Sequence, residues 1–162
     1  MCIRDRSTCV LFGDGAAAAV ISLADNQYTS VIGVDGDEEM INIKSPNGFI
    51  HMDGQGTYKF AVATVPKVIE QVVNKAGLTY DDIDHFVLHQ ANLRIIESIA
   101  NKVKQPMDKF VVNIEKYGNT SAASVGLALD EAITAGRIRK GDKVILCAFG
   151  AGRTWGAVVL EL

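Results

Sequence analysis

This chain of 162 residues has little of several features that would place it quickly in a class of proteins. It has only three cysteines, Cys2, Cys9 and Cys147, without a CxxC pair or the Cys/His spacing of a zinc site. The odd number argues against a disulfide framework and predicts reduced thiols in the cytoplasm. The longest apolar run, residues 16–21, is far too short to span a bilayer, and no segment has the pattern of a secretory signal.

The chain also lacks an excess of positive charge. Its net charge is −3, which argues against a general nucleic-acid binder. A metal site is only weakly indicated: His85 and His89 are four residues apart, but residues 84–88 are strand-like and alternate with a period of two, so the two histidines would not form a helical i,i+4 pair. With 48% hydrophobic and 22% charged residues, the composition is that of one globular domain with a sizeable core.

Apolar periodicity predicts an α/β fold. Strands and helices alternate in the order βαβαβαββ, which favours right-handed crossovers and a mixed, largely parallel five-stranded sheet with helices on both faces. Because the third helix has no charged face before Asp130, we expect it to be buried between layers. The predicted strands are residues 28–34, 84–88, 110–114, 143–148 and 155–162, and the predicted helices are residues 58–76, 92–104 and 120–135, with Pro66 either kinking the first helix or marking its first turn.

Two further segments are predicted from turn residues. Residues 8–12 and 18–23 are apolar runs around Gly13-Asp14-Gly15, a pattern typical of a hairpin. Since residues 1–6 show no periodicity, we expect either a chain that begins inside a fold or a frayed natural terminus, and composition does not separate the two. Residues 42–56 contain Pro46 and three glycines, and we expect them to form a long surface loop of the kind that is often functional.

His89 and Asn119 are the main candidates for chemistry. Each lies just beyond a predicted strand, and sites in parallel sheets collect at the carboxyl ends of strands. Together they would present two neutral hydrogen-bond donors to one carbonyl oxygen, an arrangement suited to enolate chemistry on a thioester. Taken separately, His89 is explained as a strand-end histidine and Asn119 as a helix cap.

Two more segments allow a plain and a functional interpretation. Residues 150–152 form either a simple tight turn or a turn whose backbone N–H faces a developing oxyanion. Arg94, Lys102 and Lys104 give their helix a basic side, which is either solvated or faces an acidic partner.

The motifs carrying these residues resemble those of the β-ketoacyl-acyl-carrier-protein synthase III family, in the thiolase-like superfamily. The most specific are His89-Gln90-Ala91-Asn92-Leu93-Arg94-Ile95-Ile96 and Gly118-Asn119-Thr120-Ser121-Ala122-Ala123-Ser124, and the similarity extends through Leu11 to Ala16, Met52-Asp53-Gly54, Lys59 to Val62 and Phe149 to Gly156. The resemblance implies the C-terminal half of a duplicated fold over residues 25–162, preceded in residues 1–24 by the last hairpin of the other half.

The resemblance also implies a role for particular residues. In the family a Cys-His-Asn triad condenses an acyl-CoA, here acetyl-CoA, with malonyl-acyl-carrier protein, and no cofactor is needed. His89 and Asn119 would be catalytic, the N–H of Ala151 would serve the oxyanion hole, Gly54 and Asn92 would line the pantetheine tunnel, and Arg94 would dock acyl carrier protein. Gln55-Gly56-Thr57 departs from the usual family sequence after Gly54.

The nucleophilic cysteine of the family has no counterpart here. Cys9 and Cys147 lie in predicted strands, where buried and inert thiols are expected, and Cys2 lies outside the similarity. We therefore expect this chain alone to be inactive and to need the other half, or a homodimer of the full-length enzyme. Two alternatives remain: a non-catalytic module that binds carrier protein or CoA or pairs with another chain, and a fragment that retains only malonyl-thioester decarboxylation.

Overall fold

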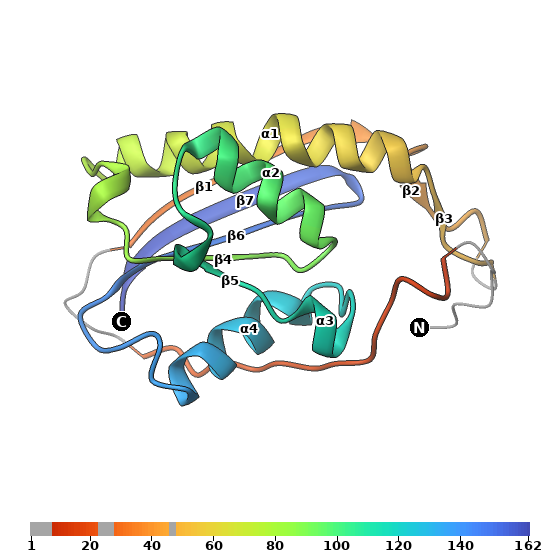
Figure 1. The fold of residues 1–162 in the computed structure, drawn as a ribbon. Helices are drawn as coiled ribbons and strands as arrows, with labels where there is room; N and C mark the ends of the chain where they lie inside the picture. Colours follow the sequence, from red (N-terminus) through yellow and green to blue (C-terminus); the bar gives the residue numbers. More distant parts are fainter. Residues whose placement is uncertain (1–7, 23–27, 46–47) are drawn as a thin grey trace.

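A mixed five-stranded sheet organises the molecule (Figure 1). The computed structural model describes residues 8–22, 28–45 and 48–162. The sheet is parallel from β6 through β4 to β5 and antiparallel where β7 joins β6 and β1. This confirms the α/β fold class and the mixed sheet. In spatial order the strands are β1 (Thr29–Asp37), β7 (Gly152–Glu161), β6 (Lys143–Gly150), β4 (His85–Leu88) and β5 (Phe110–Val111).

Helices cover both faces of the sheet (Figure 1). The helices α1 (Gly54–Lys75) and α2 (Leu93–Val103) pack on one face, and α3 (Ile114–Tyr117) and α4 (Ala123–Thr134) lie on the other. Each face has its own apolar core, the larger of which joins α1 and α2 to the sheet. The remaining elements are a small hairpin and two short 3₁₀ turns: β2 (Ile41–Asn42), β3 (His51–Met52), η1 (Tyr80–Asp82) and η2 (Met107–Lys109).

The boundaries of α1 and α2 follow from their end residues. Asp53 caps α1 by accepting the N–H of Gly56 at 2.9 Å, and Asn92 caps α2 by accepting the N–H of Arg94 at 2.9 Å. After α1, Gly77 adopts a φ of 69°, which confirms the predicted stop. Pro66 lies inside α1, so it does not mark the first turn of the helix.

The prediction of a strand over residues 110–114 is wrong beyond Val111, and Gln90 supplies the reason. Its side-chain amide donates to the carbonyl of Val111 at 3.1 Å and accepts the N–H of Asn113 at 3.1 Å. A side chain thus makes the bonds that a neighbouring strand would make. The main chain bends away after these bonds and forms α3 (Ile114–Tyr117), where the prediction had placed strand and loop.

The N-terminal segment also differs from the prediction. Residues 8–11 form a turn, and Phe12 makes only an isolated parallel bridge with Asn119. The described residues 13–22 contain no strand, so the predicted hairpin is absent from them, and the end of that prediction, together with Cys2, lies outside the described residues. A two-stranded hairpin is marginal without a sheet to extend, and here the segment instead runs alongside α4 (Figure 1).

Two other predicted boundaries need correction. The helix predicted from Thr120 begins at Ala123, and its buried residues Ser124, Ala128 and Ala132 form one line along it. Its other side approaches the N-terminal segment so closely that a Cβ on Gly126 would lie 2.5 Å from that of Ala17. The loop predicted over residues 42–56 includes β3 and the first turn of α1, since Asp53 starts the helix earlier than the apolar pattern indicated.

Among the described residues no helix is both long and apolar enough to cross a membrane.

Candidate active site

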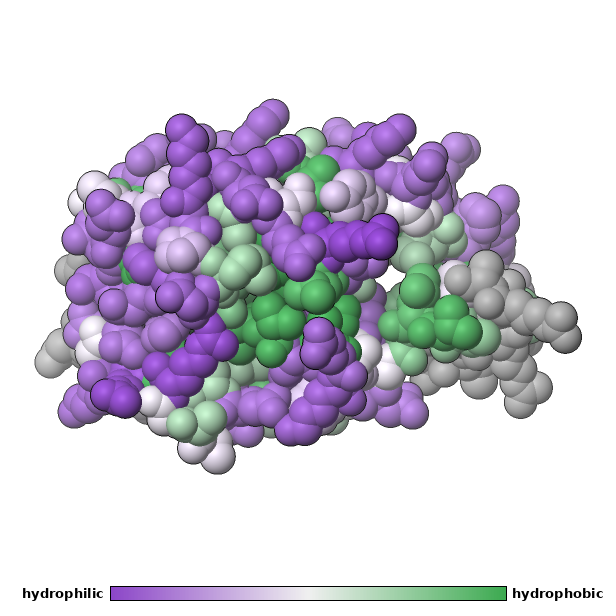
Figure 2. All heavy atoms as spheres, in the orientation of Figure 1, coloured by the Kyte–Doolittle hydropathy of each residue, from purple (hydrophilic) through white to green (hydrophobic). Residues whose placement is uncertain are grey.

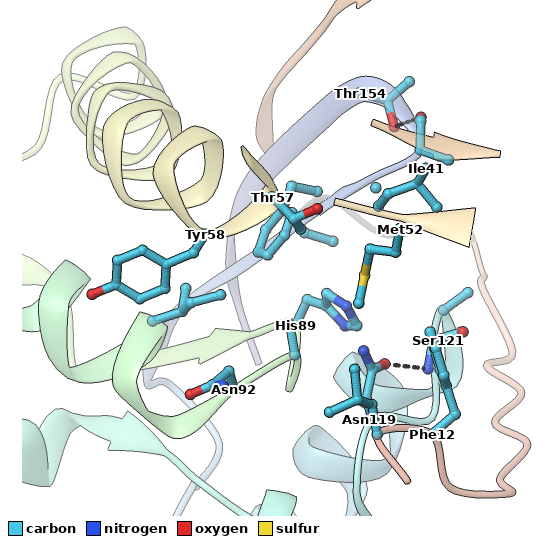
Figure 3. Close-up of a pocket in the computed structure, with 18 of the residues that line it drawn as sticks. Phe12, Ile41, Met52, Thr57, Tyr58, His89, Asn92, Asn119, Ser121 and Thr154 are labelled. Carbon is cyan, nitrogen blue, oxygen red and sulfur yellow. Dashed lines mark hydrogen bonds between the residues drawn. The ribbon is translucent and has the colours of Figure 1, made fainter. Parts of the chain in front are cut away.

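A cavity of about 940 Å³ opens at the carboxyl ends of β4 and β6. Figure 2 shows apolar side chains gathered in a recess below α2, bordered by polar ones. Polar groups are few in its lining, and Figure 3 shows His89 and Asn119 facing each other across it. The lining includes every residue singled out from the sequence, namely Gly54, His89, Asn92, Arg94, Asn119 and Ala151, together with apolar residues such as Ile41, Ile50, Met52, Phe149 and Trp155.

His89 follows the last residue of β4 and is held on both sides of its ring. Its backbone N–H donates to the carbonyl of Cys147 at 2.8 Å, which continues the pairing of β4 with β6. Its Nδ1 lies 2.6 Å from the hydroxyl oxygen of Ser124, and the ring of Phe149 packs edge-on with centroids 5.4 Å apart. Burial lowers the pKa of His89 from 6.5 to about 4, because desolvation disfavours the charged imidazolium. The ring is therefore neutral at pH 7.

Asn119 lies outside any helix or strand and is held by three hydrogen bonds. Its backbone donates to the carbonyl of Leu11 at 3.2 Å and accepts from Gly13 at 2.9 Å. Its Oδ1 accepts the N–H of Ser121 at 2.9 Å. The interpretation of Asn119 as a helix cap is wrong, since α4 starts after Ala122 and has no side-chain cap. With Oδ1 engaged in the turn, the Nδ2 donor is directed toward His89 (Figure 3).

The turn that carries Asn119 is tightly constrained. Gly118 has a φ of 67° and Ser121 a φ of 53°, a left-handed conformation that is costly for a residue with a Cβ. A Cβ on Gly13 would lie 1.8 Å from the carbonyl oxygen of Tyr117, so this close approach requires glycine. The turn thus holds the Asn119 amide in place through the backbones of two separate segments.

The other predicted site residues surround the same cavity. Gly54 is the first residue of α1, and Asn92 and Arg94 lie at the start of α2, where both are exposed. Ala151 is the turn residue between β6 and β7 and is also exposed. Its carbonyl accepts the hydroxyl of Thr154 at 3.1 Å, which braces the tight turn predicted from the glycines.

The cysteines of the described residues are poorly placed to act as nucleophiles. Cys147 is buried in β6, and burial raises the pKa of its thiol to about 12. Cys9 is exposed in the turn before Phe12, which corrects the prediction that it is buried in a strand.

Within the described ranges no group of three or more His, Cys, Asp and Glu side chains could hold a metal ion. His85 is paired instead with Asp142 at 3.4 Å.

Sequence reasoning missed two residues that hold the site together. Ser124 is 1% exposed and contacts His89, and Gln90 is fully buried and joins the ends of β4 and β5. A polar Gln directly after an apolar strand was a visible signal. Ser124 gave a weaker signal, because its contact depends on how α4 packs against the end of β4.

The chain is similar to known proteins along most of its length. The family model described as 3-oxoacyl-[acyl-carrier-protein] synthase III C terminal matches residues 73–162, and the one described as 3-oxoacyl-[acyl-carrier-protein] synthase III matches residues 2–36. The beta-ketoacyl-[acyl-carrier-protein] synthase III of Fusobacterium nucleatum is 44% identical over 177 residues, which cover 98% of this chain and 54% of that protein. The chain therefore spans about half the length of the curated relatives it matches.

Solved structures show the same relationship. The crystal structure of 3-oxoacyl-[acyl-carrier-protein] synthase III from Aquifex aeolicus VF5 is 42% identical, has a TM-score of 0.92 and is matched over 98% of this chain and 52% of that one. The corresponding enzyme of Thermus thermophilus is 40% identical with a TM-score of 0.86, over 98% of this chain and 54% of that one. These likenesses confirm the thiolase-like fold expected from the sequence motifs.

Proposed function

Because this chain belongs to the 3-oxoacyl-acyl-carrier-protein synthase III family, we propose that it supplies the His/Asn part of the active site of a condensing enzyme that starts fatty acid synthesis. The observation that carries the proposal is the convergence of His89 and Asn119 on one largely apolar cavity. The relatives are named for the use of acyl carrier protein. For this chain we propose malonyl-acyl-carrier protein and an acyl-CoA, acetyl-CoA in the first instance, as the substrates.

In the proposed reaction the two donors act on the malonyl thioester. The thioester carbonyl oxygen accepts hydrogen bonds from the His89 ring and the Asn119 Nδ2. As the C–C bond to the carboxylate breaks and CO₂ leaves, its electron pair forms an enolate whose oxygen carries the charge. Donors fixed in a water-poor site stabilise this charge more than they stabilise the neutral carbonyl. His89 is neutral and still carries one ring N–H, so it can act as an uncharged hydrogen-bond donor to this oxygen.

The enolate carbon then attacks an acyl group held as a thioester on a cysteine. The new C–C bond forms, the tetrahedral oxyanion collapses, and the cysteine thiolate leaves. We propose that the backbone N–H of Ala151, in the turn at the cavity, stabilises this oxyanion. The cysteine would come from the N-terminal half of the full-length enzyme, because Cys147 is buried and Cys9 does not match the family's nucleophile motif.

The remaining assignments are proposals supported by position. Gly54 and Asn92 line the cavity where the pantetheine arm would enter, and the exposed Arg94 stands beside it as a cation for an acidic carrier protein. Residues 1–24 are assigned to the preceding half and residues 25–162 to the C-terminal domain. No cofactor is required by this chemistry, and free cysteines suit a cytoplasmic location. The chain alone is expected not to condense.

A fusion of the N-terminal half of the Fusobacterium nucleatum relative to residues 25–162 of this chain tests the proposal. We expect it to form ketoacyl product from acetyl-CoA and malonyl-acyl-carrier protein. His89→Ala and Asn119→Ala should each lower the rate by roughly 100-fold or more, the loss expected for an oxyanion donor. Lys67→Ala, at an exposed position of α1, is the control and should leave the rate unchanged.

Two results would overturn the proposal. One is a folded fusion without activity beside an active parent enzyme, and the other is a fusion whose rate does not depend on His89. Ketoacyl product formed by the chain of 162 residues alone would contradict its expected inactivity. Release of CO₂ alone from malonyl-acyl-carrier protein, lost in His89→Ala, would instead identify a fragment that retains decarboxylation.

One observation favours a second candidate function, a non-catalytic module that binds carrier protein. Arg94 is exposed at the rim of the cavity and is available to an acidic surface without any chemistry. If this were the function, the chain alone would bind carrier protein, Arg94→Glu would abolish binding, and the fusion would stay inactive. The His89 and Asn119 variants distinguish the two functions, because a binding module has no need of both donors.

A further inference from the structure

Ser124 connects His89 to the helix on the far face of the sheet. It lies in the first turn of α4, is 1% exposed, and places its hydroxyl oxygen 2.6 Å from His89 Nδ1. The same oxygen accepts the backbone N–H of Gln90 at 3.2 Å. The hydroxyl therefore joins the residue after β4 and its neighbour to the Gly118–Ser124 motif.

The direction of the bond to His89 follows from counting donors and acceptors. A serine hydroxyl has one hydrogen and two lone pairs, and a neutral imidazole has one donor and one acceptor nitrogen. The Gln90 N–H uses one lone pair of Ser124. If His89 Nδ1 carried the proton and donated to Ser124, the buried hydroxyl hydrogen would need another acceptor, and the hydrogen bonds of the described residues provide none. A buried donor left unpaired is unfavourable.

We propose that Ser124 is a positioning residue that donates to His89 Nδ1 and so holds the imidazole in the tautomer with its proton on Nε2, the nitrogen that faces the cavity. The proposal deepens the proposed function and rests on it in one respect: this N–H is the donor that would meet the thioester oxygen. Phe149 supports the same orientation, since its ring packs against His89 and limits rotation about the side chain.

Asn119 is oriented by the same motif in a matching way. Ser121 donates its N–H to Asn119 Oδ1, which leaves the amide nitrogen as the free end. Ser124 donates to Nδ1 of His89, which leaves the Nε2–H free to donate. Two residues of one motif thereby give the cavity two donors and no competing acceptor, the arrangement that a developing negative charge requires.

Nitrogen NMR of the chain labelled with ¹⁵N-histidine tests this at about pH 7 without any substrate. Two- and three-bond couplings to the ring protons identify which nitrogen carries the proton. For His89 we expect the Nε2–H form to dominate. A dominant Nδ1–H form in the unmodified chain would overturn the proposal, and this outcome does not depend on any variant folding.

Variants then test whether Ser124 is the cause. Ser124→Ala should shift the tautomer ratio of His89 toward Nδ1–H by about fivefold, the change that corresponds to a net hydrogen bond of about 1 kcal/mol, and Ser124→Thr should restore it. Thr120→Val removes a buried hydroxyl from the same motif that has no partner among the described residues, and it should leave the ratio unchanged. A ratio unaffected by a folded Ser124→Ala chain would refute the positioning role.

The tautomer measurement and the condensation assay test different proposals, so a result can reject one proposal and keep the other. An Nε2–H tautomer that depends on Ser124, together with an inactive fusion, would keep this inference and reject the proposed function. An active fusion with His89 in the Nδ1–H form would keep the function and reject the inference.

Discussion

His89 and Asn119 line the same cavity, but they are held there by different kinds of structure. His89 continues a parallel ladder, with its N–H bonded to Cys147 of the neighbouring strand. Asn119 belongs to no strand or helix and depends on one isolated bridge to residues 11–13 and on a turn with two positive φ angles. Regular structure therefore places one donor, and irregular contacts between distant segments place the other.

This difference predicts which property of the protein a mutation near each donor will change. Changes at the end of β4 should disturb the sheet and the protein's stability. Changes around Asn119 should displace the amide while leaving the sheet intact, because Asn119 takes no part in the five-stranded sheet.

The largest effect is expected from Gln90→Leu on the His89 side. It removes the side-chain bonds to the carbonyls of Leu88 and Val111 and to the N–H of Asn113, in a site with no exposure. Each orphaned buried group costs roughly 1 to 3 kcal/mol, so with three partners lost we expect the free energy of unfolding to fall by about 3 kcal/mol or more in urea titrations. Gln71→Leu, at an exposed position of α1, is the control; an equal loss there would contradict the argument.

The effect of pH also belongs to the His89 side. Because burial lowers the pKa of His89 from 6.5 to about 4, the unfolded chain binds this proton more readily than the folded one. The contribution of His89 to the free energy of unfolding is largest above pH 6.5. It declines as the pH falls from 6.5 to about 4, by up to roughly 3 kcal/mol. Unfolding of the chain and of His89→Gln should therefore diverge across that window. Parallel pH profiles of stability for the two proteins would contradict a lowered pKa of His89.

The smallest loss of stability is expected on the Asn119 side, from Gly13→Val. The added side chain collides with the carbonyl of Tyr117, and overpacking of this kind costs roughly 1 to 3 kcal/mol. In NMR spectra the Asn119 side-chain amide should shift strongly and the His89 ring only slightly. Gly54→Ala adds a Cβ into open space and serves as the control for stability. An equal shift of both donors would show that they are not held independently.

The same comparison explains what the sequence could predict. The fold class, the family and the ends of α1 and α2, just before Gly77 and Lys104, follow from periodicity, caps and motifs, which are local signals. All six predicted site residues line one cavity, and for His89 the reason is general, since sites in parallel sheets collect at the carboxyl ends of strands.

What the sequence did not predict depends on contacts between segments. The short β5 depends on the Gln90 side chain replacing a strand, and the setting of His89 depends on Ser124 packing from α4. The N-terminal hairpin was predicted from a local turn signal, yet residues 11–13 pair with Asn119. Local periodicity carries no information about such pairings, so these corrections required the three-dimensional structure.

The bridge between Phe12 and Asn119 has a consequence for how the protein folds. It joins segments 107 residues apart in the sequence (119 − 12), and contacts with large sequence separation form slowly because a long loop must first be closed. The β6-β4-β5 part of the sheet does not require this step. We expect this part of the sheet to fold early with His89 already at its edge, and the second donor to be completed later, when the N-terminal segment docks.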